Sequence, residues 1–382
     1  MILNYFIINL FSKPVSMRST PLLFLICLTI NAHAQDDYRI YHRWINNAER
    51  CFFLEHKTDS AYSYYDLAFS KFDFVFAKDC YMAAQIAYYN KNEKYVAYLK
   101  KGFQNGLRSE QLKYSDVLAP LLKDTIAYKK KFSDYQALRK VYLKRINVWA
   151  LKKTIQHVSQ DQSEKNIRYS DNDYEDLHEY DKRLEKHISF IESMIKTVGF
   201  PGDKLIGIDQ ADIMKELGHD SSDYMDMYNL IYKDPKYHTE AMQFCTCGNC
   251  IAQASVFPLL VHQVCLYQHL SAYWEKLIVS GQIHPRDVAE LFDISLQLYD
   301  YPAVDRKRGA KIADAFACDY VRPYGGYKIS FYLHWQNFKY SNYIIDSMRT
   351  ALYINTLEVD SAKNTFGSNH GFKTNFGFWD CR

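Results

Sequence analysis

The chain has 382 residues, of which 48% are hydrophobic and 24% charged, so it is neither fully disordered nor collagen-like and can bury a sizeable core. This length suggests two domains, or one domain with an appended repeat array. The formal net charge of +3 falls to +1 when residues 1–34, whose only charges are Lys13 and Arg18, are left out. A nearly neutral chain argues against nucleic acid as the main partner.

The first 34 residues have the pattern of a secretory leader. Arg18 is followed by the apolar run PLLFLICLTI and then by Ala-His-Ala, a small-residue cleavage pattern that ends just before Gln35. The apolar run is shorter than the ~20 residues that a membrane helix needs, and no later stretch reaches that length. We therefore expect a signal peptide over 1–34, with Met17 as an alternative start, export to the periplasm or the extracellular space, and no membrane span in the mature chain.

Helix-breaking residues are rare in the first half of the chain. Only Gly102 and Gly106 precede residue 199 among the glycines, and residues 121–198 contain neither Gly nor Pro. Because Gly and Pro are the residues that weaken or end helices, their absence predicts an almost wholly helical N-terminal half.

Two segments of this half repeat each other. The segment DSAYSYYDLAFSKF aligns with NEKYVAYLKKGFQNG at an offset of 34 residues, so that Asp59 falls on Glu93. Thirty-four residues is the tetratricopeptide period, although two helical pairs of equal length would give the same offset by chance. We expect tetratricopeptide-like pairs at about 38–72 and 75–106, within a helical array over 35–156.

Four short motifs follow in a fixed order in the second half. They are DQSEKNIR at 161–168, VGFPGDKLIGI at 198–208, FPLLVHQ at 257–263 and VSGQIHPRDVAELFD at 279–293. Together they resemble an uncharacterised family of exported bacterial proteins, in which a helical, often tetratricopeptide-like part precedes a domain of unknown function. The resemblance implies such a C-terminal domain over 157–382 and supplies no activity or cofactor.

The cysteines allow two interpretations. Cys245, Cys247 and Cys250 could give a metal ion three thiolate ligands, but the spacing fits no strong zinc signature, and in exported proteins thiols more often end in disulfides. We therefore expect no bound metal and no cofactor, with this cluster as the alternative metal site and free structural thiols as a further alternative. Cys51 and Cys80 are expected on neighbouring helices, where a bridge needs Cα atoms within roughly 7 Å. The disulfide candidates are Cys51, Cys80, Cys245, Cys247, Cys250 and Cys265.

The candidates for catalysis are His262, Asp161 and Arg168, and Gln162 and Gln263 are candidates for binding. His262 lies beside Gln263 in a predicted helix, and Asp161 and Arg168 share a face of another, where they could present a carboxylate and a guanidinium to one pocket. The alternative is a satisfied core histidine and an exposed ion pair. The sequence has no Gly-x-Ser-x-Gly elbow, no His-Glu-x-x-His helix and no glycine-rich phosphate loop, so it leaves open whether the protein is an enzyme.

The segment HPRDVAELFD has the pattern of a helix start. Pro285 suits the first turn, and Asp287 and Glu290 favour the positive N-terminal end, with Asp293 one turn later. Helix capping therefore explains this pattern without any catalytic role.

The sequence thus predicts a mainly α-helical exported protein, in which tetratricopeptide-like pairs precede a mostly helical C-terminal domain with short extended segments near 325–340 and 370–380. The favoured function is a binding or scaffold module that takes a peptide or protein partner on a concave, tyrosine-rich face, as solenoids do. The alternative is a hydrolase-like or metal-dependent enzyme with a site around His262. The tyrosines of the predicted binding face are Tyr62, Tyr65, Tyr81, Tyr88 and Tyr95.

Overall fold

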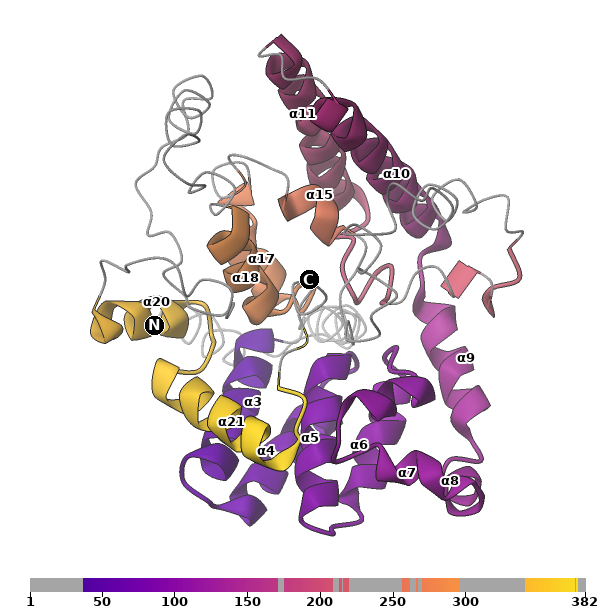
Figure 1. The fold of residues 1–382 in the computed structure, drawn as a ribbon, viewed down its shortest axis with the longest axis vertical. Coiled ribbons are helices and arrows are strands. Elements are labelled where there is room, and N and C mark those ends of the chain that lie inside the picture. The colour runs from indigo at the N-terminus through magenta and orange to yellow at the C-terminus, as the bar shows by residue number, and fades with distance from the viewer. Residues whose placement is uncertain are drawn as a thin grey trace, which may run out of the picture. The chain divides into compact units, whose positions relative to one another are not determined.

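The computed structural model describes residues 37–170, 175–208, 213–214, 216–219, 256–261, 266, 270–295, 341–374 and 376, without the side chains of 159, 162–170, 175–183, 258, 261, 294 and 295. Within these ranges the regular elements are helices and no strand forms, which confirms the prediction of a mainly α-helical fold (Figure 1). The predicted extended segment at 325–340 lies outside the described ranges. Residues Tyr38–Arg382 belong to one compact unit.

Two helical hairpins form the N-terminal part of the fold. Helix α3 (Tyr38–Phe53) packs against α4 (Thr58–Lys71), and α5 (Ala77–Tyr89) packs against α6 (Lys94–Phe103). The hairpins lie where the 34-residue offset predicts them. Residues that the offset aligns, such as Phe69 and Phe103, are buried in both hairpins. Close helix contacts thus support the pairing, and the assignment to the tetratricopeptide class stays a prediction.

Small side chains let α5 and α6 approach closely. Nearly all of α5 is buried, and Ala83, Ala84 and Ala87 are fully so. On α6, a Cβ added at Gly102 would lie 2.9 Å from Leu107 and 3.2 Å from the Cβ of Cys80 on α5. Glycine at 102 is therefore required by packing and not by an unusual backbone conformation.

Shorter elements continue the array. A 3₁₀ helix η1 (Ser109–Tyr114) leads into α7 (Pro120–Lys123), α8 (Thr125–Lys131) and α9 (Tyr135–Arg145). The side chain of Asp124 accepts a hydrogen bond of 2.9 Å from the backbone N–H of Ala127, and so caps α8. Helix α9 packs against α6, which extends the array by one layer.

A long helical hairpin follows, formed by α10 (Val148–Ser170) and α11 (Glu175–Thr197). Helix α11 ends just before Gly199, whose φ of +114° favours glycine, so the run Gly-Phe-Pro-Gly marks the end of the helix. The hydroxyl of Tyr142 receives a hydrogen bond from the backbone N–H of Ile208 (2.7 Å) and donates one to its carbonyl (2.8 Å). This hydroxyl ties the end of the array to the segment after α11.

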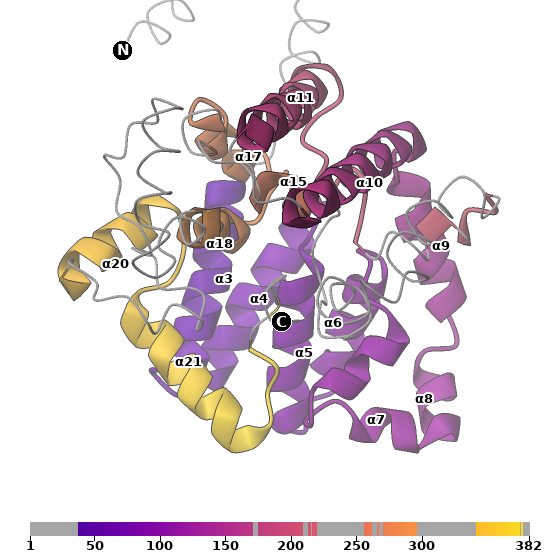
Figure 2. The same cartoon turned by 45° about the horizontal axis from the view of Figure 1, so that its top comes forward.

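The C-terminal helices return to the N-terminal hairpin. Helix α17 (Trp274–Val279) and α21 (Leu357–His370) both pack against α3, and Figures 1 and 2 show α21 alongside that hairpin. Phe372, just after α21, belongs to the same hydrophobic core as Phe52 and Phe53. The other C-terminal helices are α15 (Phe257–Val261), α18 (Pro285–Ser295) and α20 (Asn342–Ala351).

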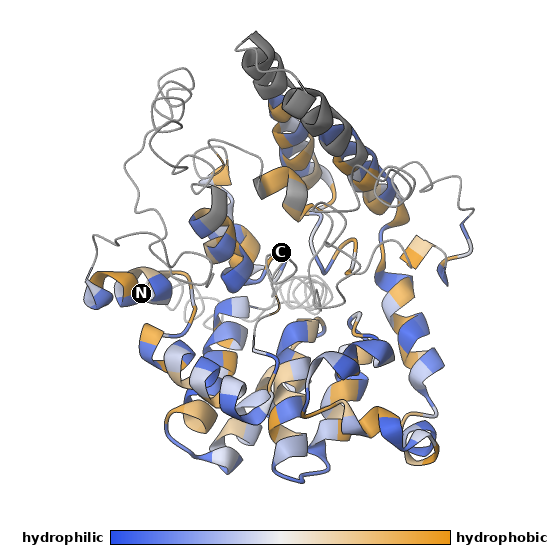
Figure 3. Cartoon of the chain, in the orientation of Figure 1, coloured by the Kyte–Doolittle hydropathy of each residue, from blue (hydrophilic) through white to orange (hydrophobic). Residues whose placement is uncertain are grey.

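Polar and apolar residues alternate around the helices, as expected for amphipathic segments packed around a core (Figure 3). Across the described residues, no helix combines the length and the apolar character that a membrane span needs.

Candidate functional site

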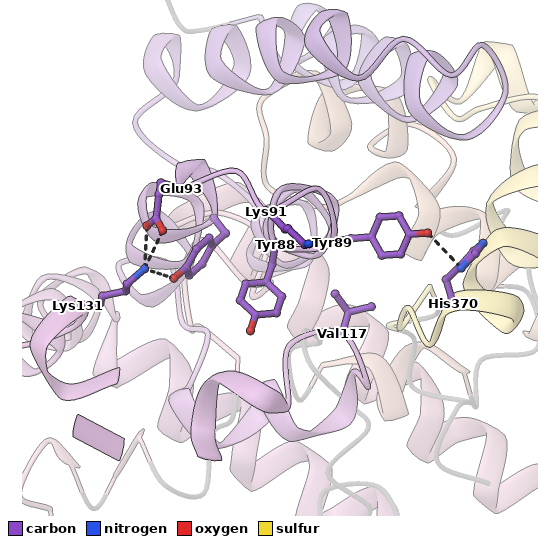
Figure 4. A pocket seen from close by; sticks show the side chains of 8 residues that line it. Tyr88, Tyr89, Lys91, Glu93, Val117, Lys131 and His370 are labelled. Carbon is purple, nitrogen blue, oxygen red and sulfur yellow. Dashed lines mark hydrogen bonds and ion pairs between the residues drawn. The ribbon is translucent and has the colours of Figure 1, made fainter. Parts of the chain in front are cut away.

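An open surface pocket of about 600 Å³ lies where the turn between α5 and α6 meets α8 and the end of α21. Figure 4 shows its two ends: Lys131 pairs with Glu93 at one end, Tyr89 meets His370 at the other, and Tyr88 and Lys91 lie between them. The lining combines aromatic rings with charged groups. It consists of Tyr88, Tyr89, Lys91, Glu93, Tyr95, Val117, Lys131 and His370.

The turn between α5 and α6, which carries Lys91 and Glu93 of the lining, is held by local hydrogen bonds. The side-chain amide of Asn90 donates to the carbonyl of Ile86 at 2.7 Å, and the side-chain oxygen of Asn92 accepts from the backbone N–H of Lys94 at 3.0 Å. Between them Lys91 has a φ of +54°, in the left-handed region that non-glycine residues rarely adopt. These bonds fix a conformation that presents Lys91 at the pocket.

Three tyrosine rings form the aromatic part of the pocket. The ring of Tyr88 meets that of Tyr95 edge to face at 5.1 Å, and the ring of Tyr89 meets that of His370 at 5.3 Å. The hydroxyl of Tyr89 lies 3.3 Å from Nδ1 of His370, and Tyr89 is 41% exposed. Edge-to-face contacts hold the rings in place while leaving aromatic surface open to a ligand.

The charges of the pocket are unevenly paired. Nζ of Lys131 donates to both carboxylate oxygens of Glu93, at 3.0 and 2.8 Å, and to the hydroxyl of Tyr95 at 2.5 Å. Hydrogen bonds to Glu93 and Tyr95 raise the pKa of Lys131, so it stays charged at neutral pH. Lys91 is exposed and forms no ion pair with a described residue. The lining therefore presents one cation whose charge is not balanced by a neighbour.

A second feature is a buried group of charged and polar side chains between α3, α5, α18, α20 and α21, which we term the junction cluster. Glu49 contacts Lys363 and, at 3.5 Å, Arg286; Arg286 in turn binds Asp360 through two bonds of 3.0 and 2.5 Å. Asp360 also pairs with the fully buried Arg349. The cluster consists of Tyr41, His42, Glu49, Lys78, Asp79, His284, Arg286, Asp287, Arg349, Asp360 and Lys363.

The imidazoles of the junction cluster sit beside a carboxylate. The hydroxyl of Tyr41 donates to Asp79 at 2.8 Å, and Nε2 of His284 lies 3.5 Å from the other oxygen of the same carboxylate. Burial, and then the charge of His284, lowers the pKa of His42 well below the ordinary value. Burial, and then the charge of Lys78, does the same for the pKa of His284, and burial raises the pKa of Asp79. Both histidines are therefore neutral in the folded protein at neutral pH.

Lys78 and Asp360 of the junction cluster are charged in the folded protein. Burial disfavours charged Lys78, but Asp287, 2.5 Å from its Nζ, together with Asp203 and Asp79 outweighs burial and raises its pKa. Burial would likewise raise the pKa of Asp360, but Arg286 and Arg349 outweigh it and hold that pKa below the ordinary value. Since opposite charges face each other here, the cluster is an ion-pair network that joins C-terminal helices to α3 and α5.

The predicted binding tyrosines divide into two groups. Tyr88 and Tyr95 line the pocket, although Tyr95 is only 5% exposed. Tyr62, Tyr65 and Tyr81 are buried in the core and do not line the pocket, which corrects the prediction that all five form one accessible face. The small residues of the helical pairs bring the helices close enough to enclose these three rings, and the hydroxyl of Tyr81 donates to the carbonyl of Gln111 at 3.1 Å.

The predicted catalytic residues are only partly described. Asp161 is fully buried on α10, so the alternative of an exposed ion pair is wrong for this residue. Gln162 and Arg168 lie on the same helix, and their side chains are outside the described part. His262 and Gln263 lie outside the described residues altogether, so a site that unites them with Asp161 stays a prediction.

Cys51 and Cys80 are free thiols, so these two disulfide candidates are not bridged to each other. Cys80 faces Gly102 on α6, whereas the sulfur of Cys51 lies 3.9 Å from a carboxylate oxygen of Glu55 just after its own helix, so the two thiols have different neighbours. The remaining candidates, Cys245, Cys247, Cys250 and Cys265, lie outside the described residues. No three or more His, Cys, Asp or Glu side chains of the described part are placed to hold a metal ion.

The predicted helix start explains where α18 begins, but it does not explain why the acidic residues of this helix are buried. The helix begins at Pro285 as predicted, yet Asp287, Glu290 and Asp293 are all buried. Capping acids normally stay in contact with water, so tertiary contacts determine the positions of these three.

Sequence reasoning identified two of the eight lining residues, Tyr88 and Tyr95, and missed the other six. Lys91 lies in a polar turn between the two predicted tyrosines Tyr88 and Tyr95, and this position could have indicated it as a site residue. Lys131 lies 38 positions after Glu93, and His370 lies 281 positions after Tyr89. No local pattern indicates that these two residues meet the turn between α5 and α6. Comparison of the chain with protein-family models, with curated proteins and with solved structures gave no match. The resemblance to an exported bacterial family therefore stays a prediction.

Proposed function

We propose that the protein is a helical binding module and that it takes a peptide segment of its partner in the pocket between α5, α6, α8 and α21. The observation that carries this proposal is the pocket itself: about 600 Å³, open to solvent, and lined by three tyrosines. Tyrosine and other aromatic side chains provide large contact areas at a small cost in conformational entropy, which is why they are frequent in binding surfaces.

The position of the pocket supports a binding role. Four separate stretches of the chain build it, at 88–95, Val117, Lys131 and His370, so its shape does not depend on a single loop. The backbone N–H of Val117 donates to the carbonyl of Gly371 at 3.4 Å, and two bonds of 2.8 and 2.6 Å join Gln85 to the backbone of Lys373. Preorganised walls lower the entropy cost of binding.

Selection from a random peptide library displayed on phage, with the full-length protein as bait, tests this proposal. The matched pair of variants is Tyr89→Ala, in the exposed part of the pocket, and Tyr343→Ala, which removes an 83% exposed tyrosine on α20. We expect enriched peptides whose affinity falls about tenfold or more in the first variant and is unchanged in the second. Peptides that bind both variants equally, or a library that yields no binder, would contradict the proposal.

We also propose that the protein is exported and cleaved before Gln35, on the strength of the Arg18, apolar-run and Ala-His-Ala order in the sequence. Mass spectrometry of the protein purified from its native cells should find an N-terminus at Gln35, unmodified or as pyroglutamate. Finding residues 1–34 intact on a cytoplasmic protein would contradict export.

A further inference from the structure

We infer that the peptide bound in this pocket carries a carboxylate next to an aromatic side chain, with the carboxylate at Lys91 and the ring on Tyr88 and Tyr89. This inference rests on the proposed function, because it names the ligand class of the same pocket.

The charge balance of the lining supports an anionic ligand. The lining residues that carry a full charge at neutral pH are Lys91, Lys131 and Glu93, and Glu93 already accepts two hydrogen bonds from Lys131. Lys91 is left as the cation without an ion-pair partner among the described residues, and its ammonium group can donate to a carboxylate. Asp116, the acid next to Val117 in the chain, lies beside Gly371 and does not belong to the lining. A cationic ligand would meet Lys91 with no free carboxylate in the lining to balance it.

The arrangement of the aromatic residues supports a ring next to that carboxylate. Tyr88 and Tyr89 are consecutive at the end of α5, and Lys91 follows them in the turn, so the apolar and the cationic contacts adjoin (Figure 4). The hydroxyl of Tyr89 is engaged with His370, whereas that of Tyr88 has no hydrogen-bond partner among the described residues. The hydroxyl of Tyr88 is therefore a further donor in the lining, and Val117 adds an apolar contact.

The carboxylate can come from an acidic side chain or from the C-terminus of the peptide, and four fluorescein-labelled peptides separate these sources. Three of them have a central phenylalanine and an amidated C-terminus, and the neighbours of the phenylalanine are glutamates, glutamines or lysines. In the fourth, phenylalanine is the last residue, glutamines precede it and its carboxylate is free. Fluorescence anisotropy with the full-length protein gives the dissociation constants.

We expect the glutamate peptide, the free-carboxylate peptide or both to bind about tenfold more tightly than the amidated glutamine peptide, as one charge-assisted hydrogen bond would give. The variant Lys91→Gln should abolish this preference and Lys91→Arg should keep it. Lys71→Gln, which removes an exposed lysine at the end of α4, should leave all four affinities unchanged and is the matched control.

Two results would overturn the inference. The lysine peptide could bind as tightly as the glutamate peptide, or the preference for a carboxylate could survive in Lys91→Gln. In both cases a loss of affinity for every peptide in Tyr89→Ala would still support the pocket as the binding site, so the failure of the ligand class is distinguishable from that of the proposed function. No binding of any of the four peptides would overturn the ligand class, and the library selection then decides the proposed function separately.

Discussion

Replacing Asp360 by asparagine removes the negative charge that joins two guanidinium groups in the interior. The carboxylate of Asp360 binds Arg286 through bonds of 3.0 and 2.5 Å and pairs with Arg349 as well. The side chains of Asp360, Arg286 and Arg349 are 12, 22 and 0% exposed, so water has no access to Arg349 and only limited access to the other two. The substitution keeps the shape of the side chain and changes its charge, which makes it a test of the ion pairs alone.

The expected loss follows from the charge count of this part of the junction cluster. Three cations, Arg286, Arg349 and Lys363, face two anions, Glu49 and Asp360. Without the charge of Asp360 the three cations share one carboxylate. Removing one partner of a buried pair typically costs about 3–5 kcal/mol, because the remaining charge stays buried and uncompensated. That is a large share of the roughly 5–15 kcal/mol by which folded proteins are stable.

Urea unfolding at pH 7.5, followed by circular dichroism, measures the free energy of unfolding of the wild type and of Asp360→Asn. The control is Glu192→Gln, which removes an exposed acid 3.7 Å from Lys196, in a pair 29 and 60% exposed. Exposed pairs of this kind contribute about 0.5 kcal/mol or less. A loss for Asp360→Asn below about 1 kcal/mol, or one no larger than that of the control, would refute the reasoning that the junction cluster is a buried network of interdependent charges.

Two further predictions concern pH and the cysteines. Because His42 and His284 are neutral when folded and protonate near pH 6.5 when unfolded, the free energy of unfolding should be highest above pH 6.5 and fall below it, by up to about 1.4 kcal/mol per pH unit and per histidine. The raised pKa of Asp79 offsets part of this loss at the acidic end, and urea titrations between pH 5 and 8 that show no fall below pH 6.5 would contradict the expectation. For the cysteines at 245–250 we expect no stoichiometric metal and at least one disulfide, checked by elemental analysis and thiol counting under denaturing, non-reducing conditions. One zinc per chain, with three or more thiols released on chelation, would be the opposite result.

The sequence predicted those parts of the fold that depend on local patterns. The stretch without Gly or Pro at 121–198, the 34-residue offset and the helix start at Pro285 all lie where the structure has helices or a helix end. Each of these signals is a property of neighbouring residues, namely amphipathic spacing or backbone freedom. The packing of α21 against α3 joins segments about 300 residues apart, and nothing local to either helix indicates it.

The candidate site was predictable only in part for the same reason. Tyr88 and Tyr95 were identified because they belong to the repeat, whereas Lys131 and His370 reach the pocket from other helices. The junction cluster shows the converse error. Charged residues are usually at the surface, so Asp287 was interpreted as a capping acid, and its burial against Lys78 follows from a contact across 209 positions of the chain.

A crystal structure of the protein with the peptide whose central phenylalanine is flanked by glutamates tests the binding site most directly. We expect the phenylalanine ring against Tyr88 and Tyr89, with a carboxylate oxygen within about 3 Å of Nζ of Lys91. A peptide bound to another face of the protein, with this pocket empty, would contradict the assignment of the pocket as the binding site.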